Sequence, residues 1–344
     1  MAILFTDGFD SYGTTTGTNL LTRWQFATVP NSFSTTTPYG VGKSHLPVQS
    51  GASDTSRIMF TATPTVTVGA AVYPNSLGTS GQYPLFGLLS GTTWMVGLVA
   101  MSDGSILVSR MTAQNSATTI GQSAARRIKL NTWYYIEFSV TISDTVGTVE
   151  VRVDGETVLS LTNVDTRNGT PTTVDTLYLG ANGSGVTNPV LVDDLYISDS
   201  ITPVGPLRVY TLRPNLDTAQ KDWAPLSGAN NYAMVADTTI DGDTSYVQAS
   251  TVGNYDLYDV GNLTPTSATI SAVNHLVWAR KTDATTRAIN LTTKSGATTT
   301  DSANTTLSAS YVGYNKLYET DPNTGSAWTV SGVNALQIGQ KIAI

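Results

Sequence analysis

The stretch Leu191–Ser200, Leu-Val-Asp-Asp-Leu-Tyr-Ile-Ser-Asp-Ser, has the pattern of a terminal strand. A matching stretch opens the chain at Ile3–Tyr12, Ile-Leu-Phe-Thr-Asp-Gly-Phe-Asp-Ser-Tyr, and it also carries acidic residues beside apolar ones. An antiparallel sandwich closes a sheet by pairing its first and last strands. We therefore predict that these two stretches pair and that they bracket one all-β domain.

The composition also favours an all-β chain. Charged residues make up only 12% of the sequence, and glutamate, a good helix former, occurs at four positions among the 344 residues. No window of a dozen residues repeats apolar positions at helical spacing, so helices should be few and short. The length predicts two domains, each large enough to bury its own core.

Charge and cysteine content exclude several classes of protein. The net charge of −7 argues against nucleic acid as a partner, because a duplex binder needs a basic face. With no cysteine, neither disulfides nor thiolate metal sites contribute to stability. No signal peptide and no membrane-spanning run is recognisable, so we expect a chain that is made in a bacterial cytoplasm and is not inserted in a membrane.

Strand-like segments recur at the short spacing expected of a sandwich. Asp154-Gly155 tolerates positive φ and predicts a two-residue hairpin turn. The flanking valines alternate with Glu150 and Arg152, so one face of this hairpin should be buried and the other wet. The segments predicted as strands are 66–73, 85–89, 94–101, 106–111, 133–142, 148–153 and 157–161.

The run Asn131-Thr-Trp-Tyr-Tyr-Ile-Glu-Phe138, followed by Val149-Glu-Val-Arg-Val-Asp-Gly155, resembles the laminin G-like pattern. This resemblance implies a concanavalin A-like jelly roll over residues 1–202. Ile201-Thr-Pro-Val-Gly-Pro206 breaks the strand pattern, because its prolines remove ladder donors. We place the domain boundary there.

Residues 203–344 are again rich in strand signals and predict a second, smaller β-sandwich. Phrases such as Asp241-Gly-Asp-Thr-Ser-Tyr-Val247 and Asp321-Pro-Asn-Thr-Gly-Ser-Ala-Trp328 resemble the C-terminal modules of structural proteins of tailed-bacteriophage virions. This domain is rich in aromatic residues and ends in the apolar stretch Ala335–Ile344, so we expect it to anchor the chain to the virion and to mediate assembly. The segments predicted as strands are 233–236, 245–250, 268–281, 287–293, 305–314 and 335–342.

The sequence shows no catalytic pattern, and we predict that the chain is not an enzyme. Glucanases of the first fold use Glu-x-Asp-x-x-Glu on one strand, because hydrolysis needs paired carboxylates. That spacing is absent, and Glu150, Asp154 and Glu156 straddle a turn that should point them into solvent. His45 and His275 are too few and too distant in sequence to indicate a metal site or a catalytic triad.

No cofactor is predicted to be required, and the one candidate ion is a structural calcium. In sandwiches that this chain resembles, calcium binds where the first and last strands meet. Carried over, that arrangement implies Asp7, Asp10 and Asp193 as ligands, with the carbonyl of Gly8. In the alternative, which the sequence favours, these aspartates cap strand ends and accept hydrogen bonds from backbone amides.

Sugar binding would require aromatic platforms beside polar loops. Candidates are Trp24, Tyr39, Tyr83 and Trp94. The alternative for each, again favoured by the sequence, is a place in the core, since a sandwich of this size buries several aromatic rings.

These patterns favour a structural component of a tailed-phage virion, either a capsid decoration protein or a tail protein that displays a lectin-like module. Its partners would be other virion proteins and further copies of itself. The alternative is a receptor-binding adhesin that recognises a host-surface glycan. A glycan-cleaving enzyme is disfavoured by the missing carboxylate pair.

Overall fold

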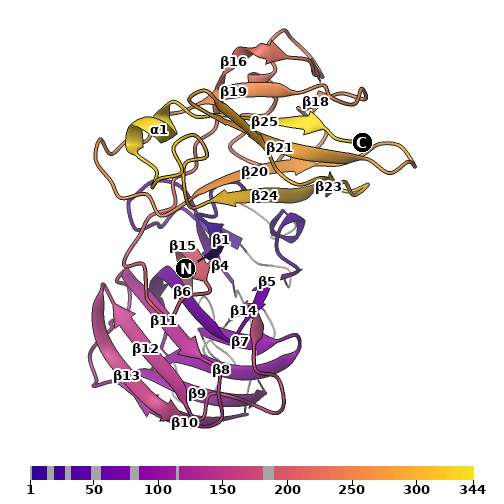
Figure 1. Cartoon of the computed structure of the whole chain (residues 1–344). Coiled ribbons are helices and arrows are strands. Elements are labelled where there is room, and N and C mark those ends of the chain that lie inside the picture. The colour runs from indigo at the N-terminus through magenta and orange to yellow at the C-terminus, as the bar shows by residue number, and fades with distance from the viewer. Residues whose placement is uncertain are drawn as a thin grey trace. The chain divides into compact units, whose positions relative to one another are not determined.

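The computed structural model describes residues 2–13, 19–27, 32–47, 56–77, 85–113, 116–180 and 190–344. The chain forms two compact units, Met1–Val209 and Tyr210–Ile344 (Figure 1). The sequence placed the division earlier, after residue 202. Nearly all regular structure is β, so the predicted fold class is confirmed.

Two antiparallel sheets build the first unit. In the described residues one sheet has eight strands in the order β13-β12-β11-β6-β15-β4-β3, with β1 paired to β15. These strands are β1 (Ile3–Asp7), β3 (Ser32–Ser34), β4 (Ser44–Leu46), β6 (Thr65–Pro74), β11 (Tyr134–Thr141), β12 (Gly147–Val153), β13 (Glu156–Val164) and β15 (Val190–Ser198).

The other sheet of this unit has seven strands in the order β10-β9-β8-β7-β14-β5-β2. They are β2 (Phe26–Ala27), β5 (Ser56–Thr63), β7 (Phe86–Ser90), β8 (Thr93–Ala100), β9 (Ile106–Ala113), β10 (Ser116–Gln122) and β14 (Val174–Leu179). A short 3₁₀ helix, η1 (Leu20–Thr22), precedes β2. Figure 1 shows β7, β8, β9 and β10 running side by side.

The two predictions that fixed this fold are confirmed. Strand β1 pairs with β15, with Asp7 opposite Leu195. The β12–β13 hairpin turns at Asp154 and Gly155, which have φ of 51° and 83°, as a mirror-image turn requires. Along β12 alternate residues are buried, because the period of two sends the valines to one face.

The second unit is a smaller sandwich. Its main sheet has six strands in the described residues, in the order β16-β19-β25-β21-β22 with β23 paired to β21, and a β20–β24 hairpin and a β17–β18 pair complete it. The elements are β16 (Pro214–Lys221), β17 (Ala224–Pro225), η2 (Tyr232–Met234), β18 (Val247–Gln248), β19 (Asp256–Val260), β20 (Val273–Ala279), β21 (Ala288–Ser295), β22 (Thr298–Asp301), β23 (Thr305–Thr306), β24 (Val312–Tyr318), α1 (Val330–Asn334) and β25 (Gln337–Ile342).

Two small clusters form the core of this unit. Ile289, Leu291 and Ile342 of the main sheet pack against Val277 and Tyr314 of the hairpin. A second cluster contains Trp328, whose indole nitrogen donates to the Tyr318 carbonyl at 2.9 Å. In the described part of the chain no helix is long and apolar enough to span a membrane.

Candidate functional site

The carboxylate of Asp7, at the end of β1, anchors a buried cluster. Its Oδ2 accepts hydrogen bonds from the Tyr12 hydroxyl at 2.6 Å and the Trp24 indole at 2.9 Å, and it lies 3.1 Å from the Arg23 guanidinium. Its Oδ1 accepts from the Phe9 amide at 2.9 Å. Both oxygens are therefore occupied, by donors from the residues that follow β1 and from the segment around η1.

Trp24 belongs to the core of the unit. Its side chain is 1% exposed and its ring contacts Phe5 and Phe9 at centroid distances of 5.7 and 5.8 Å. A sugar-stacking ring must offer a face to solvent, so the proposal of Trp24 as a platform is wrong. The place in the core is the alternative that the sequence favoured for this ring. What the sequence did not show is that Asp7, 17 residues away, accepts the hydrogen bond of the indole.

Asp193 and Asp194 are adjacent and buried in β15, at a register shift against β6. Asp193 accepts the Asp194 amide at 2.8 Å, and Asp194 accepts the Val209 amide at 2.7 Å. Burial, and then the neighbouring Asp194 charge, raises the pKa of Asp193 to about 9. Burial raises the pKa of Asp194 to about 7.

Asp10 accepts the Lys43 amide at 2.8 Å and adds negative charge near both aspartates. Within the described ranges no group of three or more His, Cys, Asp or Glu side chains is arranged to hold a metal ion. Of the three predicted calcium ligands, Asp7 is already engaged by four donors. Calcium at Asp7, Asp10 and Asp193 stays a prediction.

The remaining predicted aromatic platforms differ from one another. Tyr39 is 52% exposed, and the Arg208 guanidinium lies over its ring at 4.3 Å. Tyr83 lies outside the described residues. Trp94 is half-buried in β8 and meets Tyr178 of β14 edge-on, with ring centroids 4.8 Å apart.

Tyr178 belongs to a row that crosses the seven-stranded sheet. Backbone pairing places Arg57, Tyr178, Gly87, Gly97 and Ser109 opposite one another on five successive strands. Directly paired residues share a face of a sheet. The Arg57 guanidinium lies 5.7 Å from the Tyr178 ring centre, and the Trp94 contact places that indole on the same face.

This row lies on the face turned away from the other sheet. The opposite face carries Leu88, Val96 and Arg110 in one paired row. Arg110 forms an ion pair with Asp165, which directly follows β13 of the eight-stranded sheet. That apolar face therefore lines the core between the sheets.

In this row Gly87 and Gly97 face each other on neighbouring strands, so no side chain covers the backbone at these two positions. Glycine inside a strand often marks a close approach by a ligand or another backbone. Beside them the Ser109 hydroxyl is buried and finds no hydrogen-bond partner among the described residues. The glycines of Phe86-Gly87-Leu88 and Val96-Gly97-Leu98 were visible in the sequence, but their pairing was not.

The other ionisable groups singled out by the sequence have separate structural partners. Glu150 binds Arg152 at 2.7 Å, whereas Asp154 accepts the Tyr135 amide at 2.8 Å. His45 contacts the Ser56 hydroxyl at 2.8 Å, and burial lowers its pKa to about 3. His275 contacts the Thr293 hydroxyl at 3.0 Å, and its pKa is lowered to about 3 by the same cause.

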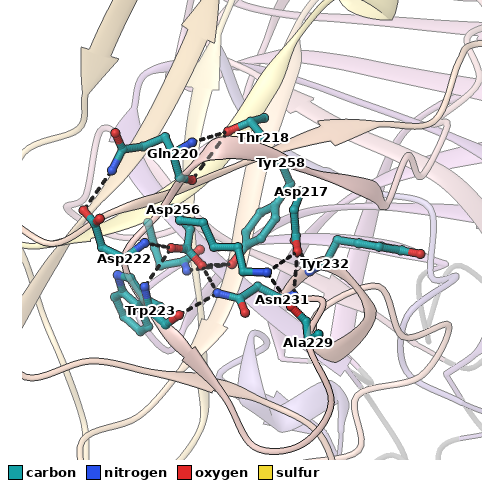
Figure 2. Close-up of polar contacts among 12 residues, drawn as sticks. Asp217, Thr218, Gln220, Asp222, Trp223, Ala229, Asn231, Tyr232, Asp256 and Tyr258 are labelled. Atoms are coloured by element: carbon teal, nitrogen blue, oxygen red, sulfur yellow. Dashed lines mark hydrogen bonds and ion pairs between the residues drawn. The ribbon is translucent and has the colours of Figure 1, made fainter.

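In the second unit a polar network surrounds the fully buried carboxylate of Asp256 (Figure 2). Its Oδ1 accepts the amides of Asp222 and Trp223, at 2.7 and 2.9 Å. Its Oδ2 accepts the Asn231 side-chain amide and the Tyr258 hydroxyl, both at 2.7 Å. Four donors from three segments make this an anchor that ties irregular chain to β19.

No protein-family model and no curated protein matches the sequence. Among solved structures, the chain is similar to the alginate lyase Aly36B in complex with an alginate tetrasaccharide, with 14% identity, a TM-score of 0.39, and coverage of 56% of this chain and 95% of that one. An endo-β-1,4-glucuronan lyase from the fungus Trichoderma reesei gives 13% identity, a TM-score of 0.40, and coverage of 60% and 100%.

A third similar structure is domain 4 of AbnA, an extracellular arabinanase from Geobacillus stearothermophilus, in complex with arabinotriose. It has 20% identity, a TM-score of 0.34, and coverage of 54% of this chain and 79% of that one. These similarities concern the fold, and none of the three descriptions names a virion protein.

The prediction that the chain is not an enzyme is contradicted by this comparison, because two of the similar structures are glycan lyases. The prediction used the paired carboxylates that glycoside hydrolysis requires. A lyase breaks its bond by elimination, so the absence of Glu-x-Asp-x-x-Glu does not exclude cleavage of a glycan.

Proposed function

We propose that the first unit binds a glycan on the outer face of the seven-stranded sheet, at Trp94. The observation that carries this proposal is the row formed by Arg57, Tyr178, the two facing glycines and Ser109, with the Trp94 ring beside it. Ligand sites combine aromatic surface with a few fixed polar groups. This row supplies both.

Each member has a distinct role. Trp94 is the half-buried ring that a sugar stacks on, and the fully buried Tyr178 ring packs edge-on against it. Arg57 adds donors beside the two rings. Asn168 fixes the Trp94 backbone by donating from its side-chain amide to the Trp94 carbonyl at 2.9 Å.

Binding is tested on a glycan array with the full chain, followed by calorimetric titration of the best oligosaccharide. Trp94→Ala should weaken binding at least about tenfold, the effect of losing roughly 1.4 kcal/mol. The matched control is Trp133→Ala, which removes a half-buried indole whose ring is tilted against that of Tyr73, with centroids 5.3 Å apart. An intact chain that binds no glycan, or equal losses in both variants, would overturn the proposal.

The same oligosaccharides, incubated with the chain and separated by size, report on cleavage. Shortened products that disappear in Trp94→Ala would extend the proposal from binding to catalysis on this face. Products that persist in that variant would place cleavage elsewhere.

We propose in addition that the chain acts in a tailed-phage virion, which would present the glycan site to a host surface. This proposal is supported by the resemblance of the phrases at 241–247 and 321–328 to virion modules. Deleting residues 207–344 should then abolish incorporation into particles, measured by mass spectrometry of purified virions. Particles that still carry the shortened chain would refute an anchoring role for the second unit.

A further inference from the structure

The segment that follows β15, residues 200–209, crosses the eight-stranded sheet without forming helix or strand, and we call it the strap. Its backbone amides bind side chains of that sheet. Val204 donates to the Tyr196 hydroxyl at 3.0 Å, Gly205 to Glu137 Oε1 at 2.7 Å, and Val209 to Asp194 Oδ1 at 2.7 Å.

The face beneath the strap is shaped for a flat ring and a carboxylate. Tyr196 pairs with Gly69 across the strands, and a Cβ built on Gly69 would lie 2.1 Å from the Tyr196 ring. The ring therefore rests on bare backbone. Its hydroxyl donates to Glu137 Oε1 at 2.6 Å, and burial, followed by the Glu137 hydrogen bond, raises the Tyr196 pKa.

The strap leaves acceptor capacity unused on this face. Glu137 Oε2 and Asp194 Oδ2 are both buried, and neither finds a hydrogen-bond partner among the described residues. The two side chains belong to residues that are 1% and 3% exposed. A buried acceptor without a donor is costly, so a covering group richer in donors would satisfy this face better than the strap does.

We propose that the strap is displaceable and covers a second saccharide-binding face, on which Glu137, Tyr196 and Asp194 accept hydroxyl donors in place of the strap's amides. A saccharide carries several hydroxyls on one rigid ring, and can therefore supply the additional donors that two open carboxylate oxygens require. Arg152 and Glu150, ion-paired and partly exposed on the paired strand β12, border this face.

Closure of the strap lowers the apparent affinity of this face, because only the open fraction binds. Three hydrogen bonds, two of them to carboxylates, imply that release should raise binding roughly 10- to 100-fold. The strap is attached at its start by the Thr67 hydroxyl, which donates to the Ser200 carbonyl at 2.6 Å. Opening then requires these three amide contacts to break, and it also separates the Arg208 guanidinium from the Tyr39 ring, over which it lies at 4.3 Å.

The test uses the full chain carrying Trp94→Ala, so that the site proposed above does not contribute. Gly205→Pro removes the amide that donates to Glu137 and cannot adopt the φ of 95° found at Gly205. Gly228→Pro is the matched control, since Gly228 also has a positive φ, 73°, but lies in the second unit. Val204→Pro is a second release variant, should the first fold poorly.

Hydrogen exchange should show the Val209 amide exchanging faster in Gly205→Pro and unchanged in Gly228→Pro. Binding to an array of neutral oligosaccharides should rise roughly 10- to 100-fold in the release variant only, and adding Glu137→Gln should return it to the control level. An unreleased strap, release without a gain in binding, or a gain that survives Glu137→Gln would each overturn the proposal.

Discussion

Replacing Asp7 by alanine should destabilise the first unit more than any surface substitution. The change removes a carboxylate that binds four donors and leaves the Arg23 guanidinium, 5% exposed, without its partner. Tyr12 and Trp24, 2% and 1% exposed, lose their acceptor at the same time. Removing one member of a buried ion pair costs about 3–5 kcal/mol, a large part of the roughly 5–15 kcal/mol that holds a typical domain folded.

Urea unfolding followed by tryptophan fluorescence measures this loss, because Trp24 reports on the affected cluster. For a unit of this size about 1 kcal/mol shifts the melting temperature by about 2–4 °C, so the expected fall is about 6–20 °C. The control is Asp103→Ala. Asp103 is exposed, and within the described part of the chain its carboxylate accepts hydrogen bonds from the amide and the hydroxyl of Ser105, so its replacement should cost much less than that of Asp7.

The result also separates the two roles suggested for Asp7. If Asp7 anchors Arg23, Tyr12 and Trp24, Asp7→Ala should lower the free energy of unfolding by the same amount in calcium and in a chelator. If the free energy of unfolding of Asp7→Ala lies within about 1 kcal/mol of that of the intact chain, the anchoring role is refuted. A loss seen only with calcium present would show that Asp7 acts as a metal ligand instead.

Three further predictions concern the remaining acidic groups. Asp193 and Asp194 have pKa values of about 9 and about 7 in the fold, above the roughly 3.9 of an unfolded aspartate, so their contribution is present at low pH and is lost as pH rises from about 4 towards 9. Melting curves across that range should show the loss, and an equal slope in Asp193→Asn would contradict it. If calcium binds with Asp10 and Asp193, adding it at pH 8 should raise the melting temperature, and Asp10→Asn should abolish that rise; no rise in the intact chain would exclude the ion. Asp256→Ala should destabilise the second unit by about 3 kcal/mol or more, because four donors around a fully buried site lose their acceptor; urea unfolding that shows no separate loss for this unit would show that the network contributes little.

Local patterns were sufficient where one short segment determines its own structure. The alternation along β12 and the Asp154-Gly155 turn specify a hairpin without help from the rest of the chain. The second unit was predicted less well. Residues 233–236 were predicted as a strand but overlap η2, and the single strand expected over 305–314 is two strands, β23 and β24, separated by residues 307–311.

Those errors have a common physical cause. Short apolar runs fit a strand and a turn of helix equally well, and long-range partners choose between them. Near η2, the amides of Asn231 and Tyr232 donate to the Asp217 carboxylate at 2.9 and 2.6 Å. These contacts to a residue of β16 hold the chain at η2 in a helical turn, which the local sequence pattern does not predict.

The sequence by itself determined that the chain is all-β. It also determined that the first and last strands of the first unit pair with each other, and that the clearest hairpin turns at Asp154-Gly155. Composition, alternation and turn residues act over a few positions, so they can be recognised without coordinates. Only the tertiary structure decided what the polar residues do. It buried Trp24 against Asp7, aligned Arg57, Tyr178, Gly87 and Gly97 across neighbouring strands, and laid the strap on Glu137. The row depends on the register between strands that are distant in sequence, and that register is set by packing of the whole sheet. The other two contacts join segments that only the fold brings together.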